Sequence, residues 1–218
     1  GKAQPKEIGY FSFTVKAAEE IRNRVARGNM SENELKKMYP YFCTLHSLAY
    51  KCLRLEPHEI MDELDYMELS DMTGRKFVNK MKKGNGMDFS MPTAQSQYQD
   101  TINLAYAKYP HDEDRLSKIF KEVKLSDYGA RNTILQMDED LKNFKKARHK
   151  LEYVDYFNTF LQTRNPPHLE YLFIDEAQDL SAHQWMVVDM IQQVAQPKET
   201  YVAGDDDQAI FRWAGADI

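Results

Sequence analysis

The sequence predicts an α/β protein whose parallel sheet is interrupted by a mostly helical insertion. Two apolar runs indicate the sheet: one at 171–174 ends in an Asp-Glu pair, and one at 201–203 ends in Gly-Asp-Asp-Asp-Gln. Ahead of these runs, residues 57–165 show helical periodicity and no convincing strand. Polar side chains at strand ends are typical of open α/β sheets, which bind ligands just outside the carboxyl ends of their strands.

The N-terminal segment predicts two short strands, each followed by a helix. Residues 7–13 alternate loosely and are rich in aromatic side chains, which favours a strand, and residues 16–27 have helical spacing. A second strand is predicted over 39–43, and a helix runs from Ser47 to about Arg54. Pro57 marks the break before the insertion.

The insertion divides the predicted domains. Residues 1–56 and 166–218 form one α/β domain, and residues 57–165 form a helical inserted subdomain. Within it, the polar stretches 84–86 and 92–99 are predicted to be loops. Two apolar stripes at helical spacing predict buried helix faces, Leu116, Ile119, Phe120 and Val123 in the first and Met137, Leu141, Phe144 and Leu151 in the second.

Composition predicts a globular protein in a reducing, intracellular (cytoplasmic) setting. The chain is 42% hydrophobic, which suffices for a core, and its net charge of −5 does not by itself demand a nucleic-acid or membrane partner. Cys43 and Cys52 lack CxxC spacing, which favours buried thiols over metal ligands. No apolar run approaches the roughly 18 residues of a membrane span. One helix face could contact phosphates or simply be solvated, and it carries Lys142, Lys145, Lys146 and His149.

The acids after the two apolar runs suit a site for ATP and Mg²⁺. Mg²⁺ prefers one or two protein carboxylates together with phosphate oxygens, and Asp175 directly follows the strand, so we assign it the metal. Glu176 suits the general base that polarises the attacking water. Gln208, after the neighbouring strand, is placed to sense the γ-phosphate through its amide. The alternative is structural, because Asp-Glu pairs are common at helix N-termini, where the helix dipole favours acids.

Five short segments occur in an order that resembles the UvrD/PcrA/Rep-type superfamily 1 DNA helicases. They are residues 11–20 (FSFTVKAAEE), 44–49 (TLHSLA), 153–156 (YVDY), 175–179 (DEAQD) and 204–217 (GDDDQAIFRWAGAD). The fourth is similar to the family's Walker B motif and the fifth to its third motif. The resemblance implies a partial first RecA-like domain of the P-loop NTPase type. It covers both ends of the chain, whereas 57–150 matches only in being helical and in standing where the family has its inserted subdomain.

Aromatic residues near the C-terminus predict binding of single-stranded DNA. Phe211 and Trp213 face the same way if the segment is extended, and stacking contributes about 1–3 kcal/mol per base. By resemblance these are the stacking residues, and their short link to Gln208 would couple ATP to DNA. Read without the resemblance, Phe13 is a core strand residue and His46 a structural histidine. The resemblance implies further contacts along the strand by Phe13, Thr14, Lys16, Thr44 and His46.

Parts of the family's ATP site are missing from the sequence. A Gly-rich loop ending in Gly-Lys-Thr or Gly-Lys-Ser is expected, but the only Gly-Lys is Gly1-Lys2, followed by Ala3. Nothing after the third motif matches the second RecA-like domain of the same polypeptide. Ala214 also stands where better-known members have an arginine. We therefore expect a helicase fragment that alone hydrolyses ATP negligibly.

The resemblance implies a parent protein that uses ATP to move 3′→5′ on single-stranded DNA towards a duplex junction. The alternative is a non-enzymatic module that binds single-stranded DNA or pairs with a helicase. The reading frame on either side would discriminate the two, because an upstream Gly-Lys-Thr and downstream helicase motifs favour the fragment.

Overall fold

The computed structural model describes residues 3–26, 30–78 and 94–205. The chain divides into two compact units, residues 1–54 with 155–218 and residues 55–154. Residues 155–165, which the sequence-based boundaries assigned to the insertion, belong to the first unit.

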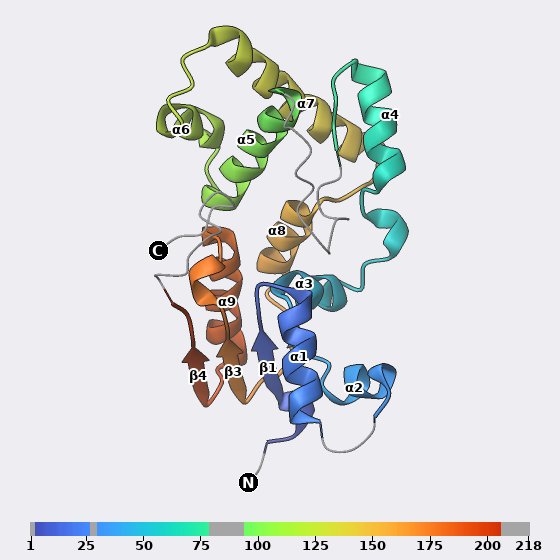
Figure 1. Cartoon of the computed structure of the whole chain (residues 1–218), viewed down its shortest axis with the longest axis vertical. Helices are drawn as coiled ribbons and strands as arrows, with labels where there is room; N and C mark the ends of the chain where they lie inside the picture. The colour runs from blue at the N-terminus through green and yellow to red at the C-terminus, as the bar shows by residue number, and fades with distance from the viewer. Residues whose placement is uncertain (1–2, 27–29, 79–93, 206–218) are drawn as a thin grey trace. The chain divides into compact units, whose positions relative to one another are not determined.

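The first unit is built on a parallel sheet of four strands in the order β2-β1-β3-β4 (Figure 1). The α/β class and the parallel sheet predicted from the sequence are therefore confirmed. In register, Ile8 of β1 pairs with Tyr171 of β3, and Tyr171 in turn pairs with Glu199 of β4. All strands point the same way, so their carboxyl ends meet at one edge. The strands are β1 (Ile8–Phe11), β2 (Phe42–Cys43), β3 (Tyr171–Ile174) and β4 (Glu199–Val202).

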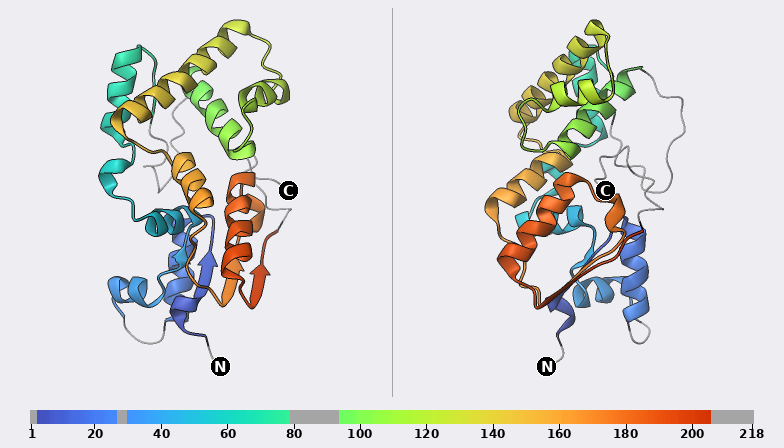
Figure 2. Two further views of the ribbon diagram at one scale, coloured as in Figure 1. Left: turned by 180° about the vertical axis from the view of Figure 1, so that it is seen from behind. Right: turned by 90° about the vertical axis from the view of Figure 1, so that its left-hand side faces the viewer.

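Helices cover both faces of this sheet. The β1–β2 connection contains α1 (Val15–Val25) and α2 (Glu32–Met38), and the β3–β4 connection contains α9 (Ala182–Ala195). These connections run towards opposite edges of the sheet, and crossovers of one hand then place their helices on opposite faces. Figure 2 shows α1 and α9 in those positions. Two further α-helices described in this unit are α3 (Leu45–Leu53) and α8 (Tyr153–Thr163), and the boundary between the units falls in the first turn of α8, at Asp155.

Side-chain caps start two helices directly after strands. Thr14, three residues beyond β1, caps α1 by accepting a hydrogen bond from the Ala17 amide at 3.2 Å. Thr44, next after β2, caps α3 in the same way through the Ser47 amide at 3.2 Å. A cap of this type stabilises a helix by about 1 kcal/mol. Both caps fix the point at which the chain turns from strand into helix at the carboxyl edge.

The second unit is helical in its described part, with one isolated bridge between Ile60 and Leu151. Its core brings together Ile119 of α6 with Ile134 and Met137 of α7, each fully buried. A nearly buried ion pair joins Lys145 to Glu152 at 2.9 Å, and the Tyr66 hydroxyl donates to the same carboxylate at 2.6 Å. Lys145 thus belongs to neither a solvated nor a phosphate-contacting face. The helices described in this unit are α4 (Glu63–Thr73), α5 (Ala94–Lys108), α6 (Arg115–Glu122) and α7 (Tyr128–Arg148). Short 3₁₀ turns in the described residues of the chain lie at Pro5–Glu7, Pro57–Glu59 and Ala177–Asp179.

The strand predicted over 39–43 is shorter in the structure, because residues 39–41 form a turn in which the Phe42 amide donates to the Tyr39 carbonyl at 3.3 Å. Only Phe42–Cys43 pair with β1, and a helix that the sequence analysis did not predict, α2, precedes the turn at Glu32–Met38. The signal for α2 was present, because Ser31 and Glu34 form a capping box in which each side chain bonds the other's amide. The helix is short and mostly exposed, so apolar periodicity alone did not reveal it.

Two other expectations for the second unit were wrong. The polar stretch predicted as a loop is helical from Ala94 onwards, and the rest of the predicted loops, at 84–86 and 92–93, lies outside the described residues. Val123 is 49% exposed because it caps the C-terminus of α6, where helical spacing no longer holds. Leu151 lies beyond the end of α7 and pairs with Ile60 instead.

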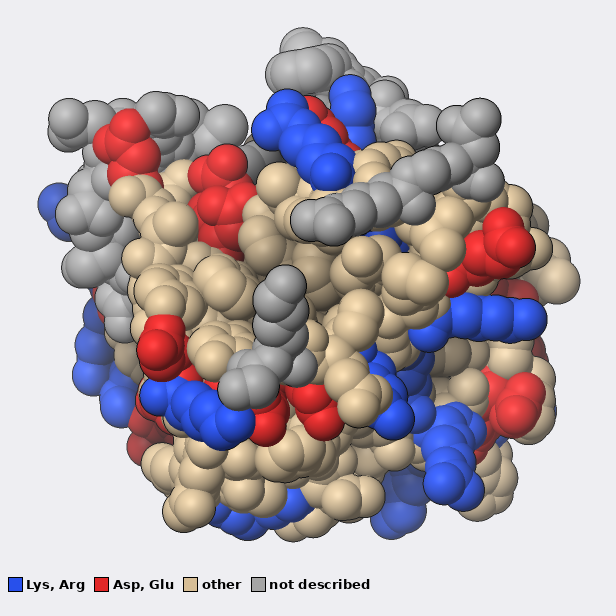
Figure 3. Space-filling model, turned by 90° about the horizontal axis from the view of Figure 1, so that it is seen from below, with Lys and Arg blue, Asp and Glu red and all other residues tan. Residues whose placement is uncertain are grey.

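Exposed charges of opposite sign lie close together, and both cysteine thiols are free. Figure 3 shows a face on which Lys and Arg are interspersed with Asp and Glu, and Lys198 pairs with Glu170 at 2.7 Å. Such exposed pairs contribute little to stability, because water and salt screen them. Burial raises the pKa of both Cys43 and Cys52 to about 11, which keeps these free thiols protonated. Within the ranges that the structure describes, no helix is long and apolar enough to span a bilayer.

Candidate active site

The Asp-Glu pair is held between two neighbouring strands at the carboxyl edge of the sheet. The Asp175 amide donates to the Phe11 carbonyl at 2.9 Å, which extends the β1–β3 ladder by one bond. On the other side, the Ala203 amide donates to Ile174 at 2.8 Å, and the Ala177 amide donates back to Ala203 at 2.9 Å. The backbone carrying the two acids is therefore fixed from both sides.

Asp175 has a side-chain partner that the sequence reading missed. The Tyr10 hydroxyl donates a hydrogen bond to Asp175 Oδ2. The Tyr10 ring stacks on Phe42, with centroids 5.6 Å apart, so strand β2 supports the phenol. Burial, followed by the hydrogen bond and the negative charge of Asp175, raises the pKa of Tyr10 well above its usual range. Tyr10 is thus a fixed donor that orients the carboxylate.

Replacing Tyr10 by phenylalanine is expected to lower the free energy of unfolding by about 1 kcal/mol, because one hydrogen bond to a half-buried carboxylate is lost. Urea denaturation of the chain measures this cost. The same change in an Asp175→Ala background, which removes the acceptor, should cost measurably less if the two side chains are coupled. An equal cost in both backgrounds would show that the bond contributes nothing.

Glu176 has an unusual backbone conformation. Its φ and ψ of 55° and 43° lie in the left-handed region, which costs a non-glycine residue about 1–3 kcal/mol and is frequent at functional sites. The conformation turns the chain sharply from β3 into the 3₁₀ turn Ala177–Asp179 and leaves the Glu176 side chain exposed at the sheet edge. Gln178 Nε2 donates to Glu176 Oε2 at 2.7 Å.

Gln178 also contacts the segment that follows β4. Its Oε1 accepts a hydrogen bond from the Asp205 amide at 3.1 Å, and the side chain is only 6% exposed. Gly204 makes this approach possible, because a Cβ atom there would lie 2.7 Å from Gln178 Oε1 and 3.2 Å from the backbone nitrogen of Gln178. The sequence reading assigned no role to Gln178.

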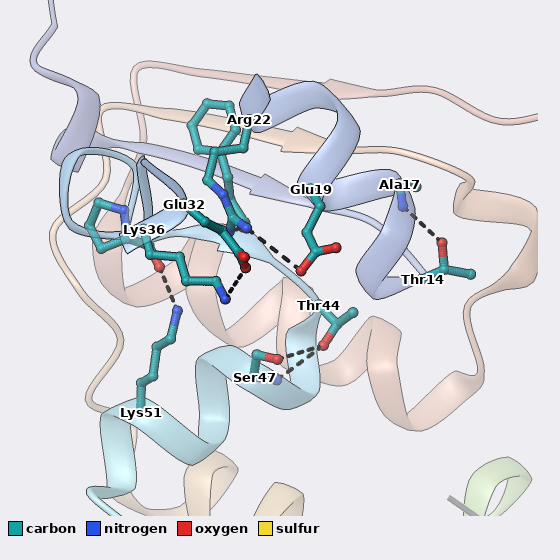
Figure 4. Close-up of polar contacts among 11 residues, drawn as sticks. Thr14, Ala17, Glu19, Arg22, Glu32, Lys36, Thr44, Ser47 and Lys51 are labelled. Carbon is teal, nitrogen blue, oxygen red and sulfur yellow. Dashed lines mark hydrogen bonds and ion pairs between the residues drawn. The ribbon is translucent and has the colours of Figure 1, made fainter. Parts of the chain in front are cut away.

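The candidate DNA-binding residues of α1 lie at the same edge. Phe13 is half-buried, whereas Thr14 and Lys16 are exposed in the turn and first helical residues after β1. Figure 4 shows the Thr14 hydroxyl directed at the Ala17 amide. Thr44 is buried, and its hydroxyl both accepts from the Ser47 amide and donates to Ser47 Oγ at 3.1 Å. Both threonine hydroxyls thus serve as helix caps.

His46 lies in an aromatic cluster. Its ring stacks on Phe157 with centroids 4.3 Å apart and meets Tyr156 edge-on at 6.2 Å. His183 contacts the same Phe157 ring edge-on at 5.2 Å. Burial, with a smaller contribution from His183, lowers the pKa of His46 to about 4. His46 is therefore a neutral, packed ring at physiological pH, and its predicted contact with DNA stays a prediction.

The remaining predicted residues, Gln208, Phe211 and Trp213, lie outside the described residues. Asp205, the last residue described, is exposed and leads towards them. The structure thus brings together Asp175, Glu176 and the start of the segment that carries these three residues.

The donor set at the edge fits Mg²⁺ bound together with a nucleotide. Among residues 3–26, 30–78 and 94–205 (side chains from 97), no group of three or more His, Cys, Asp or Glu could hold a metal by itself. Mg²⁺ commonly takes one or two carboxylates and completes its shell with phosphate oxygens and water. A half-buried Asp175, oriented by Tyr10 beside an exposed Glu176, matches that requirement.

The sheet carries its paired carboxylates at the edge where open α/β domains bind their ligands. The chain belongs to the family described as the UvrD/REP helicase N-terminal domain, whose model matches residues 1–218. It is 25% identical over 222 residues to the ATP-dependent DNA helicase Rep of Buchnera aphidicola subsp. Schizaphis graminum, covering 98% of this chain and 32% of that protein. It is also 25% identical to the ATP-dependent DNA helicases PcrA of Staphylococcus epidermidis and Staphylococcus aureus, covering 98% of this chain and 29% of each. The chain therefore spans about a third of the length of these curated relatives.

Proposed function

We propose that this chain is part of an ATP-dependent DNA helicase that moves 3′→5′ on single-stranded DNA. The sheet-containing unit would be part of a first RecA-like ATPase domain, and the helical unit would be its inserted subdomain. The observation that carries the proposal is the Asp175–Glu176 pair, anchored between β1 and β4 at the ligand-binding edge of the sheet. The relatives named Rep and PcrA support the helicase assignment.

In this proposal the two acids have different tasks. Asp175, held by Tyr10, would bind Mg²⁺, which when bound neutralises charge on the phosphates. Glu176 is exposed, and Gln178 holds its Oε2 atom, so Oε1 would accept the proton of the attacking water. Gln208 would sense the γ-phosphate through its amide.

Single-stranded DNA would follow the carboxyl edge of the sheet. Lys16 is exposed in the first turn of α1, where its ammonium group and the helix N-terminus both favour a phosphate. Phe211 and Trp213 would stack on bases, each contributing about 1–3 kcal/mol. Because the threonine hydroxyls are used as caps, contacts at Thr14 and Thr44 would come mainly from the backbone around them. Phe13 and His46 complete the proposed set.

The full-length gene product is expected to hydrolyse ATP, and oligo-dT should stimulate the rate. The 218-residue chain alone is expected to turn over negligibly, because its sequence contains no Gly-Lys-Thr or Gly-Lys-Ser to hold the phosphates. A steady-state ATPase assay on both proteins, with and without oligo-dT, tests this directly. Quenching of tryptophan fluorescence by oligo-dT that Trp213→Ala removes would establish the stacking role. DNA binding by the full-length product without hydrolysis would instead favour the non-enzymatic module.

A further inference from the structure

The Gln178 side chain forms hydrogen bonds with two segments that have different roles in the proposed function. Its amide nitrogen donates to Glu176 Oε2 at 2.7 Å, on the side of the proposed general base. Its amide oxygen accepts from the Asp205 backbone at 3.1 Å, on the side that leads to the proposed DNA platform. A single planar group therefore connects the two.

The chemistry of the amide permits only one orientation. A flipped amide would set its oxygen against the Glu176 carboxylate and its NH₂ group against the Asp205 N–H, so both contacts would become repulsive. A charged neighbour on one side and a backbone donor on the other thus fix both ends of Gln178.

Packing leaves this bridge little freedom. Gln178 is 6% exposed, and Gly204 lies so close that any added Cβ would contact the amide oxygen at 2.7 Å. The backbone of the 3₁₀ turn that carries Gln178 is held to β4 through the bond from Ala177 to Ala203. A displacement of Asp205 therefore cannot be absorbed by free rotation of Gln178, and it would be transmitted to the carboxylate of Glu176.

We propose that Gln178 is a positioning residue that couples the segment after β4 to Glu176, so that DNA bound beyond Asp205 sets the orientation of the base. The inference rests on the proposed function and adds a residue to its machinery. It assigns the coupling to the side chain that joins Glu176 to the Asp205 amide. Loss of the two Gln178 hydrogen bonds should therefore lower the stimulation of ATP hydrolysis by DNA more than it lowers DNA affinity or the ATPase rate without DNA.

Two substitutions distinguish the contact of Gln178 with Glu176 from its contact with the Asp205 amide. Gln178→Met keeps the length and burial of the side chain but removes both hydrogen bonds. Gln178→Glu keeps an oxygen for the Asp205 amide but places a second negative charge against Glu176. Gln99→Met is a matched control, because Gln99 is 2% exposed and bridges the Val78 amide and carbonyl at 2.9 and 3.0 Å in the other unit.

Amide hydrogen exchange in the 218-residue chain tests the bridge without any activity. Gln178→Met should speed exchange at Asp205 by about fivefold, the equivalent of one ordinary hydrogen bond. Gln178→Glu should leave that amide protected, and Gln99→Met should not change it. Unchanged exchange at Asp205 in Gln178→Met would overturn the bridge, whether or not the protein is an ATPase.

The ATPase rate of the full-length product, with and without oligo-dT, tests the coupling. Both Gln178 variants should lower the fold-stimulation by DNA by at least about fivefold, a typical coupling between sites. Gln99→Met should retain the stimulation of the wild type. Wild-type stimulation in Gln178→Met overturns the inference and leaves the proposed function standing. An inactive wild-type enzyme overturns the proposed function, while the exchange result still decides the bridge.

Discussion

Glu176→Gln is expected to reduce the DNA-stimulated kcat of the full-length product by about 10²- to 10⁴-fold, because an amide cannot accept the proton of the attacking water. The change preserves the size of the side chain, and its amide oxygen can still accept the hydrogen bond from Gln178. KM for ATP should change much less than kcat, since the phosphates are bound elsewhere. Steady-state kinetics at saturating oligo-dT measure both constants.

Glu170→Gln provides the matched control for this experiment. Glu170 precedes the same strand at its amino end, where it pairs with Lys198 at 2.7 Å. The substitution makes the same chemical change away from the carboxyl edge, so kcat should stay close to that of the wild type. A kcat for Glu176→Gln that is also close to wild type would rule out Glu176 as the base.

The stability of the chain is expected to fall by on the order of 3 kcal/mol between pH 6.5 and pH 4 through His46 alone. In the folded state the pKa of His46 is about 4, whereas an unfolded histidine titrates near 6.5. Between these values the unfolded chain binds a proton that the folded chain refuses, so lower pH favours unfolding. Above pH 6.5 both states are neutral, and the contribution is fully present.

Urea denaturation followed by tryptophan fluorescence at several pH values measures this slope. His46→Phe should remove most of the difference, because a phenyl ring can keep the stack on Phe157 without a titrating group. His58→Asn, at an exposed histidine, should retain the wild-type slope. A slope that His46→Phe leaves unchanged would contradict burial as the cause of the low pKa.

Much of the fold could be predicted because its signals are local. The apolar run at 171–174 ends in acids and forms β3 with the predicted bounds. The stripes of α6 and α7 bury Ile119, Met137 and Leu141 as helical spacing requires. Predictions failed where apolar periodicity was weak, as for the short polar helix α2 and the polar stretch at which α5 begins.

The partners within the candidate site could not be predicted in this way. Tyr10 and Asp175 are 165 residues apart, and they meet because β1 pairs with β3 as well as with β2. A tyrosine in a strand is usually a core residue, so the residues around Tyr10 do not indicate that its hydroxyl contacts Asp175. The approach of Gln178 to Asp205 likewise depends on β3 and β4 being neighbours and on the absence of a side chain at Gly204.

By itself the sequence determined the family motifs and the candidate residues on which the proposed chemistry rests. The Asp-Glu pair, the capping threonines and the motif order are fixed by residue identity and short spacing, which act over a few residues. Only the tertiary structure decided which groups meet, because the order of strands in a parallel sheet is set by long crossovers that short-range patterns do not encode. That order gives Asp175 its tyrosine, links Glu176 through Gln178 to Asp205, and packs His46 against Phe157.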